Sequence, residues 1–442
     1  MKSPPNILWI FTDQHRASAM GCAGDLNIET PHLDALAARG VRFSNAYSNT
    51  PLCSPFRASL FTGQYSTTHG VISNHRPLLP VQPELPELVR NAGYFTSYRG
   101  KWHASGGCFG HHFVSPWFRP GWEDWIGWEN SGKSHWDFEY AEQNSPKIHV
   151  AKEYMTDWLA NSTIDFIQGR QENEQPWFHV VSIEPPHPPR RVPEIYWNQY
   201  KDREIVLREN IDPEHPKFGE YLLDLRQYYA QIKCVDDNVG RIVQTLKDTG
   251  QYDNTVIAYL SDHGDTLGSH GRQGKSRPEE ESSGIPLLIS GPGIEHKGTV
   301  SKALISGVDM MPTFLGLLDM EIPGSVEGSD LSRLLKDQTA EGAECAYLQY
   351  EHCGFPQKAN SVWRTLCKNN WKYTWHLAEG EMQLFDIEKD PFELNNLVND
   401  NSSKAVREEL LAEMKQKAES INDKFFDRRE AFLKGNNWEY LM

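Results

Sequence analysis

Residues 6–14 read Asn-Ile-Leu-Trp-Ile-Phe-Thr-Asp-Gln, an almost unbroken apolar run that stops at an acid and an amide. A short continuous run of this kind, rich in β-branched and aromatic residues, is typical of a strand buried on both faces of a parallel sheet. We therefore predict a buried strand over residues 7–12. The polar residues that follow it would lie at the carboxyl edge of the sheet, where ligands bind in open α/β folds.

The first 330 residues repeat this pattern of short apolar runs separated by longer amphipathic stretches, which predicts strand–helix–strand units and an α/β class. Thr30 followed by Pro31 is typical of a helix start, with the threonine as the N-cap residue. Residues 105–150 fit neither the helical nor the strand period. Further strands are expected at residues 94–98, 178–183, 255–260 and 287–290, and helices at residues 30–39 and 222–247.

The pattern changes after about residue 330, where short alternating segments precede one charged helix. Such segments are typical of a small antiparallel sheet with one face on a core. We predict a catalytic domain over residues 1–335 and a smaller α+β subdomain over residues 336–442. The alternating segments lie at residues 346–350, 361–366, 371–376 and 382–387, and the helix at residues 404–424.

Composition excludes several classes of protein. The chain has 442 residues with 60 acidic and 44 basic side chains, so its formal net charge is −16. This balance argues against nucleic acid or an anionic membrane as the main partner, because both select a basic surface. No run approaches the roughly 18 apolar residues that span a bilayer, and no secretory leader pattern opens the sequence. Seven scattered cysteines without C-x-x-C spacing predict no disulfide framework, so we expect a cytoplasmic protein.

Polar residues follow four of the expected strands: Asp13-Gln14-His15, then a segment with Lys101 and His103, then Glu184-Pro-Pro-His187, then Asp262-His263. Because parallel strands share one carboxyl edge, we expect these groups to converge on a single site. Any one of them alone has an ordinary interpretation, such as a turn residue that bonds its own backbone.

A divalent cation would suit part of this convergent group. Hard cations select carboxylate and amide oxygens, which Asp13, Gln14 and Asp262 can supply. His263 is a less usual calcium ligand and keeps manganese open as an alternative.

Residues 51–63 read Pro-Leu-Cys-Ser-Pro-Phe-Arg-Ala-Ser-Leu-Phe-Thr-Gly. Ser54 followed by Pro55 indicates a helix start, with the proline at the first helical position. Cys53 would then lie at a helix N-terminus, where backbone amides and the helix dipole attract anions. The alternative interpretation of Cys53 is a buried thiol that packs as a small hydrophobic residue.

With these stretches taken together, the chain resembles the sulfatase family, the formylglycine-dependent branch of the alkaline-phosphatase-like hydrolases. The resemblance implies an alkaline-phosphatase-like core with a mostly parallel sheet flanked by helices, followed by a small C-terminal antiparallel sheet with a helix. It extends to about residue 400, in the family's order. The matching stretches are NILWIFTDQ, TPHLDALAARGVRFSNAY, CSPFRASLFTG, GKWH, EPPHPP, YLSDHGD, HGRQGKS, PLLISGPG and LFDIEKDPFELNNL.

The resemblance implies that a separate maturation enzyme oxidises Cys53 to formylglycine, a step that needs Pro55 and Arg57. One hydroxyl of the hydrated aldehyde would attack sulfur, and the second would let the intermediate release sulfate. A plain serine would stay trapped as a sulfate ester.

The resemblance also assigns roles to the convergent polar residues. Lys101 and Lys275 would contact the sulfate oxygens, and His187 would protonate the leaving oxygen as general acid. His103 and Arg57 would orient the aldehyde hydrate. One divalent metal ion, with Ca²⁺ as the first expectation and Mn²⁺ or Mg²⁺ as alternatives, would be held by Asp13, Gln14, Cys53, Asp262 and His263.

Two alternatives to a sulfuric-ester hydrolase stay open. The Asp13-Gln14 pair, where many relatives have two acids, also occurs in phosphonate monoester and phosphodiester hydrolases of the same superfamily. If Cys53 stays a thiol, the protein would be a non-catalytic binder of sulfated ligands.

A substrate pocket is the least defined part of the prediction. Six of the 14 tryptophans fall between residues 102 and 136, and tryptophan faces stack well on sugar rings, which favours a sulfated carbohydrate. For most of these tryptophans, however, the preferred interpretation is that they fill the core under a long loop. Other candidate pocket residues are His111, His112, Arg190, His352 and Arg364.

Overall fold

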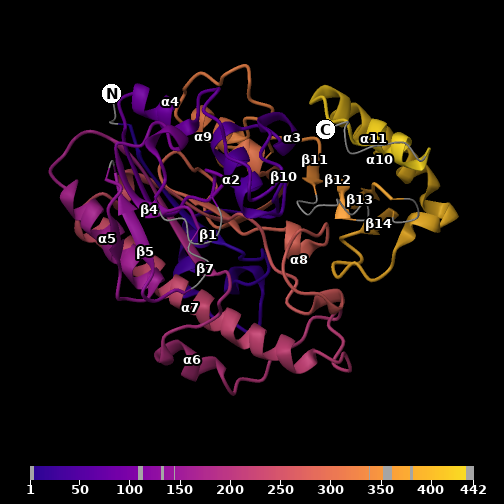
Figure 1. Ribbon diagram of the computed structural model, residues 1–442, viewed down its shortest axis with the longest axis horizontal. Helices are drawn as coiled ribbons and strands as arrows, with labels where there is room; N and C mark the ends of the chain where they lie inside the picture. Colours follow the sequence, from indigo (N-terminus) through magenta and orange to yellow (C-terminus); the bar gives the residue numbers. More distant parts are fainter. Residues whose placement is uncertain are drawn as a thin grey trace.

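The computed structural model describes residues 4–107, 113–130, 134–143, 145–337, 339–351, 361–378 and 382–434. Its main element is a 10-stranded sheet in the order β10-β2-β9-β8-β1-β7-β3-β4-β5-β6, and a second sheet has the order β11-β12-β13-β14 (Figure 1). The predicted α/β class, with a mostly parallel sheet and a small antiparallel sheet after it, is confirmed.

The centre of the large sheet consists of the four strands that the sequence predicts to end in functional residues. They are parallel neighbours: β8 (Thr255–Ser261), β1 (Asn6–Asp13), β7 (Trp177–Pro186) and β3 (Phe95–Lys101). All eight residues of β1 are buried, which explains its unbroken apolar sequence. The four carboxyl ends therefore lie side by side.

The outer strands differ from the prediction. The expected strand at residues 287–290 is β9 (Leu287–Ser290), but it runs antiparallel to both of its neighbours. The sequence analysis missed β2 (Gly40–Tyr47) and β10 (Thr299–Ser306). Both strands contain polar residues that are not fully buried, so neither is a continuous apolar run. It also missed β4 (Asp124–Trp128), β5 (Glu139–Glu142) and β6 (Ile148–Val150), which are short and lie within the stretch that fits no period.

Helices cover both faces of the sheet because successive β1 residues point to opposite faces. Leu8 and Ile10 pack with α1 (Pro31–Arg39), α5 (Met155–Gly169) and α7 (Phe218–Asp248). Ile7, Trp9 and Phe11 pack with α2 (Cys53–Thr62), α4 (Leu85–Asn91) and α9 (Gly307–Leu317) on the other face. Figure 1 shows α7 below the sheet and α2, α4 and α9 above it.

Two short helices flank these layers, α3 (Ser66–His69) after α2 and α8 (Glu280–Ser283) before β9, while α6 (Glu194–Tyr200) lies beside α7 (Figure 1). Thr30 is the N-cap residue of α1 and Pro31 opens the helix, as predicted, but the Thr30 side chain makes no capping hydrogen bond. The Thr30 hydroxyl instead donates to Asp34 at 3.0 Å. Among the described residues, none of the helices combines the length and apolar character that crossing a membrane requires.

The C-terminal region forms the predicted antiparallel sheet and ends in two helices. The predicted helix at residues 404–424 is α10 (Lys404–Ser420), and a separate α11 (Phe425–Leu433) follows it. The second sheet shares an apolar cluster with the first, in which Tyr47 and Leu304 contact Leu348 and Trp363. The domain boundary at residue 335 stays a prediction. The strands of this sheet are β11 (Ala346–Tyr350), β12 (Trp363–Lys368), β13 (Trp371–His376) and β14 (Met382–Asp386).

Candidate active site

The carboxyl ends of the central strands bring oppositely charged side chains into contact. Asp13 is the last residue of β1, Lys101 is the last residue of β3, and their carboxylate and ammonium groups are 2.7 Å apart. Asp262 follows β8, and Glu184 in β7 lies 3.6 Å from the Lys101 ammonium. The sheet order therefore produces the convergence that the sequence predicts.

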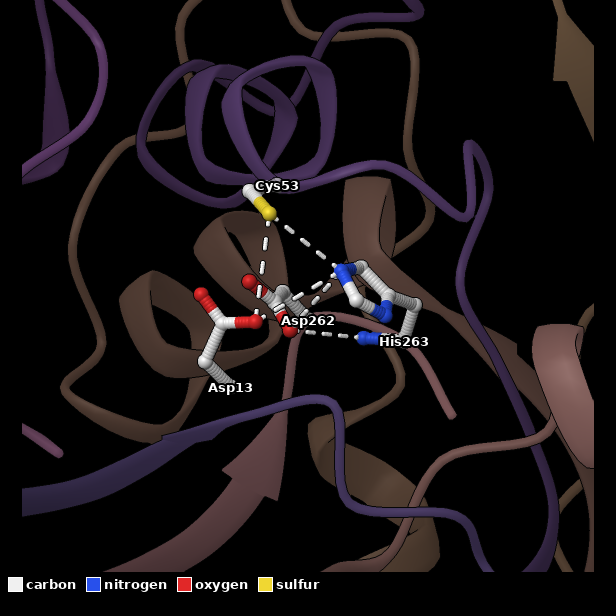
Figure 2. A group of neighbouring side chains, drawn as sticks. All are labelled: Asp13, Cys53, Asp262 and His263. Carbon is white, nitrogen blue, oxygen red and sulfur yellow. Dashed lines mark hydrogen bonds and ion pairs between the residues drawn. The ribbon is translucent and has the colours of Figure 1, made fainter. Parts of the chain in front are cut away.

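Four ligand groups gather at this edge within a small volume. One potential ligand atom from each of Asp13, Cys53, Asp262 and His263 lies within 4.8 Å of the others, and all four residues are buried (Figure 2). His263 Nδ1 lies 3.0 Å from the carbonyl oxygen of Gly264, which keeps the proton on Nδ1 and leaves the Nε2 lone pair for the cluster. Two carboxylates with one imidazole are a donor set that fits a divalent cation.

Gln14 completes the group, and its amide is oriented by a residue that the sequence analysis did not select. The Gln14 side-chain NH₂ donates to Asp265, so its oxygen Oε1 points the other way and accepts from Lys275 at 3.1 Å. The Gln14 backbone N–H also donates to Asp262 at 3.0 Å, from a left-handed backbone with φ of 71°. Asp265 thus orients the Gln14 amide so that its carbonyl oxygen faces the site.

The charges of the cluster explain two opposite pKa shifts. Burial opposes ionisation of Asp13, but the positive charges of Lys101 and Lys275 hold its pKa well below the usual value. Burial, together with repulsion from Asp13, raises the pKa of Asp262 to about 6. A divalent cation between the two carboxylates would remove this repulsion.

Cys53 is the first residue of α2 and is 1% exposed. Its Sγ lies 2.9 Å from the Lys275 ammonium. It also lies 3.4 Å from His263 Nε2 (Figure 2). These neighbours are charged or polar, so the interpretation of Cys53 as a thiol packed among apolar groups does not fit. The helix N-terminus and Lys275 together favour an anion at this position.

The predicted start of α2 is wrong by two residues. Leu52 is the N-cap residue, in an extended conformation, and Pro55 is the third helical residue rather than the first. A proline is tolerated there because the first turn of a helix has no internal acceptor for its N–H groups. Ser54 does not cap the helix, and its backbone N–H donates to the Asn74 side chain at 3.0 Å.

Arg57, one turn along α2 from Cys53, lies behind the carboxylates. Its guanidinium is 3.3 Å from Asp13 and 3.3 Å from Asp262, and all three side chains are fully buried. It also donates to the Lys101 carbonyl oxygen and to Ser182 Oγ, each at 2.8 Å. Arg57 therefore compensates two buried negative charges and fixes α2 to the sheet.

The two predicted histidines lie beside the charged cluster. His103 is buried, and its Nε2 lies 3.3 Å from the Asn130 amide. His187 is half-buried, and its Nδ1 lies 2.6 Å from the carbonyl oxygen of Pro188. Burial and the charge of Lys101 hold the pKa of His103 well below its usual value, and burial with Lys275 does the same for His187.

The access side of the site follows from exposure. The Lys275 side chain is 17% exposed and His187 is half-buried, whereas Asp13 and Lys101 are enclosed. The more open side of the site is therefore at Lys275 and His187.

The pocket candidates from the tryptophan-rich stretch fall into different environments. Arg364 is fully buried and paired with Asp423 and Glu351, so it lines no open pocket. Trp136 and Arg190 line a cavity near the site. His111, His112 and His352 lie outside the described residues. Four of the six tryptophans are core residues: Trp102, Trp122, Trp125 and Trp128.

A mostly parallel sheet with a group of possible cation ligands at its carboxyl edge places the protein in the alkaline-phosphatase-like class. Comparison with known families agrees. The model of the Sulfatase family matches residues 5–320, and one described as N-sulphoglucosamine sulphohydrolase, C-terminal, matches residues 268–420. The chain therefore belongs to the sulfatase family, and it is a sulfatase enzyme.

Individual relatives resemble the chain over nearly its whole length. The ulvan-active sulfatase of Formosa agariphila is 32% identical over 447 residues, which cover 99% of this chain and 85% of that protein. The N-acetylglucosamine-6-O-sulfatase of Bacteroides thetaiotaomicron is 26% identical over 509 residues, covering 97% and 89%. The crystal structure of yidJ from Bacteroides fragilis has a TM-score of 0.88 and 30% identity, and covers 96% of this chain and 97% of that one.

Proposed function

We propose that the enzyme releases inorganic sulfate from a sulfated carbohydrate. A formylglycine derived from Cys53 would be the nucleophile, and one divalent cation, with Ca²⁺ as the first expectation, would assist it. Asp13, Gln14, Asp262, His263 and the modified Cys53 would hold the cation. The observation that carries the proposal is the contact of Cys53 Sγ with the Lys275 ammonium, at 2.9 Å, on the rim of a cluster of cation ligands.

Charge supports an anionic substrate. Within the cluster, three cationic side chains (Arg57, Lys101 and Lys275) stand against three carboxylates (Asp13, Asp262 and Glu184). This group is therefore balanced before any metal is added. A bound divalent cation would leave an excess of two positive charges in a water-poor site, which a sulfate ester and its developing negative charge would neutralise.

The chain's own residues would divide the work as follows. The hydrated aldehyde at position 53 supplies a nucleophile that can expel sulfate afterwards, and the cation polarises the ester and lowers the pKa of that nucleophile. Lys275, at the open side, would hold the sulfate oxygens. Lys101 keeps Asp13 ionised at 2.7 Å and would face the sulfate from the enclosed side. Arg57 and His103 would orient the aldehyde hydrate.

His187 would donate the proton to the leaving oxygen. Its Nδ1 is hydrogen-bonded to the Pro188 carbonyl oxygen. The other ring nitrogen, Nε2, is therefore the one that would donate a proton to a ligand. Because burial and Lys275 lower the pKa of His187, protonation would need the negative charge of a bound substrate. We expect His187→Asn to lower kcat by about 10²–10⁴-fold on a sugar sulfate. The loss should be much smaller on 4-nitrophenyl sulfate, whose leaving group needs no proton. Equal losses on both substrates would contradict this role.

A carbohydrate is proposed because the relatives named above act, by their names, on ulvan and on N-acetylglucosamine 6-O-sulfate. The modification of Cys53 makes a formylglycine-generating maturation enzyme a transient partner. Sulfate release from a panel of sulfated mono- and oligosaccharides, measured after co-expression with such an enzyme, tests the proposal. Absence of release from every member, with the aldehyde present, would contradict it.

Gln14 favours one second candidate, a phosphonate monoester or phosphodiester hydrolase, because it gives the cation one negative charge fewer than an acid would. The ratio of kcat/KM on 4-nitrophenyl sulfate and 4-nitrophenyl phenylphosphonate separates the two functions. We expect the sulfate to be preferred, and the reverse ratio would support the alternative. The mass of the tryptic peptide with Cys53 tests the third possibility, a non-catalytic binder, because formylglycine is lighter than cysteine.

Removal of the cation is expected to abolish activity and to lower thermal stability. A ligand present at 100 times its Kd stabilises the folded state by about 2.7 kcal/mol, so chelation by EDTA should lower the Tm measurably. Added Ca²⁺ should restore both activity and Tm. Asp262→Asn should weaken this response, whereas Asp237→Asn, in an acidic group with His32 and Asp236 away from Cys53, should not. An EDTA-treated enzyme that keeps full activity would contradict the metal proposal.

A further inference from the structure

A cavity of about 490 Å³ lies beside the access side of the site, and no catalytic role has been assigned to it. It is formed by the segment at residues 134–137, the segment at residues 190–192, α6 and α7. Its volume falls in the range of pockets that hold small ligands. The lining includes Trp136, Asp137, Arg190, Arg191, Trp197 and Gln227, and we call it the Trp136–Trp197 cavity.

A series of short contacts connects this cavity to the group of cation ligands around Asp13 and Cys53. Arg190 is 9% exposed, lines the cavity and pairs with Asp265, the residue that orients the Gln14 amide. Gln14 in turn contacts Lys275, which contacts Cys53 Sγ. The cavity and the reacting group are therefore joined by a series of direct side-chain contacts.

The cavity lies on the leaving-group side. The proposed general acid, His187, is three residues before Arg190 in the same segment. Because the alcohol that leaves must approach His187, a sugar chain attached to it would continue along the same segment toward residues 190–192. The Trp136–Trp197 cavity is thus where the next sugar unit would lie.

Two partly exposed aromatic rings suit the apolar face of a sugar ring. Trp136 and Trp197 are each half-buried, and both line the cavity. The Trp136 ring is held in place by Tyr154, with ring centroids 4.6 Å apart. Such a fixed aromatic surface binds a ring with little loss of side-chain freedom.

The charges of the lining select an anionic sugar. Asp137 is paired with Lys152 at 2.9 Å, and Arg190 is shared between Asp224, at 2.9 Å, and Asp265. Arg191 is exposed and has no ion-pair partner among the residues that the structure describes, so its guanidinium can pair with an anionic group of a ligand. In addition, the buried Nε of Arg190 lacks a hydrogen-bond partner in the described part of the chain. A buried donor of this kind is costly unless a ligand or water accepts from it.

We propose that the Trp136–Trp197 cavity is a subsite for a second sugar unit that bears a sulfate or a carboxylate group. This inference rests on the proposed function, because it assigns the substrate as an anionic oligosaccharide rather than a sulfated monosaccharide. The sugar ring stacks on the two tryptophans, and its anionic group pairs with Arg191.

Two variants of the metal-loaded, modified enzyme test the subsite: Trp197→Ala and Arg191→Ala. Sulfate release is measured on 4-methylumbelliferyl sulfate and on mono-, di- and tetrasaccharides prepared from ulvan, chondroitin sulfate and heparin. Each variant should lower kcat/KM on the best tetrasaccharide by about 10-fold or more, because Arg191→Ala loses one charge-assisted contact and Trp197→Ala loses one stacked aromatic ring. Both variants should leave the aryl sulfate nearly unchanged. The controls are Trp117→Ala and Arg90→Ala, which remove exposed residues of the same types outside the cavity.

The possible outcomes separate the two proposals. Equal losses on both substrates, no loss on the tetrasaccharide, or a wild type that prefers the monosaccharide would overturn the subsite. A wild type that releases sulfate from none of these compounds would contradict the proposed function instead. Calorimetric binding of the same tetrasaccharides to Cys53→Ala then still decides the subsite. Introducing Trp197→Ala into Cys53→Ala should weaken that binding by about 10-fold, because a stacked aromatic ring is lost. Absent or unchanged binding would overturn the subsite.

Discussion

Replacing Cys53 with alanine is expected to give a folded protein without measurable sulfate release. The change removes the only atom at this position that a maturation enzyme could oxidise, and loss of a covalent nucleophile costs on the order of 10⁵-fold or more in kcat. The fold should survive, because alanine favours helices and Cys53 is the first residue of α2, with few apolar contacts to lose. Sulfate release with circular dichroism as the measure of folding checks both parts.

Cys53→Ser distinguishes the chemistry of the aldehyde from a simple need for a nucleophile. A serine hydroxyl could attack once, but the resulting sulfate ester has no internal way to break down. The variant should therefore complete at most one turnover and gain the mass of a sulfuryl group. Cys345→Ala serves as the matched control, because that cysteine is partly exposed and lies in the C-terminal region. Full turnover by Cys53→Ala, or full activity with an unmodified thiol, would contradict the mechanism.

The central strands could be predicted because nearly all of their residues lie in the same environment, the buried interior. β1 and β8 are buried on both faces, so both are continuous apolar runs whose ends differ from the predicted bounds by at most one residue. The edge strand β10 alternates between partly exposed and exposed residues over its first half, which weakens the same signal. The antiparallel direction of β9 depends on the path of residues 284–286 between α8 and β9, and a local apolar run carries no information on direction.

The residues of the candidate site likewise fall into those that the sequence could predict and those that it could not. Asp13, Lys101 and Asp262 could be selected from sequence because each ends or follows a buried strand, and sheet geometry then brings them together. The pairing of Arg190 with Asp265 joins residues 75 positions apart, and no local pattern indicates it. Trp197 was missed because α6 is a short helix outside any motif. Asp265 did have a local signal, since it stands two residues after His263.

Arg57→Leu is expected to destabilise the protein strongly, and the loss should depend on the cation. Arg57 is the buried partner of Asp13 and Asp262, and removal of one member from a buried ion pair costs about 3–5 kcal/mol because it leaves uncompensated charge. A divalent cation bound by the same two carboxylates would replace part of the lost positive charge. Urea unfolding with and without Ca²⁺ should therefore show a larger stabilisation by Ca²⁺ in Arg57→Leu than in the wild type, provided that the cluster still binds the ion.

Arg364→Leu is the matched control for this experiment. Arg364 is also fully buried and paired with two acids, Asp423 and Glu351, but it lies in the C-terminal sheet away from the cation cluster. Its removal should cost a similar free energy of unfolding and leave the Ca²⁺ response at the wild-type value. If Ca²⁺ stabilises both variants equally, or neither, Arg57 does not share its carboxylates with a cation. A Ca²⁺ stabilisation that is larger in Arg57→Leu than in Arg364→Leu and the wild type would connect the stability of the fold directly to the charge balance on which sulfate binding depends.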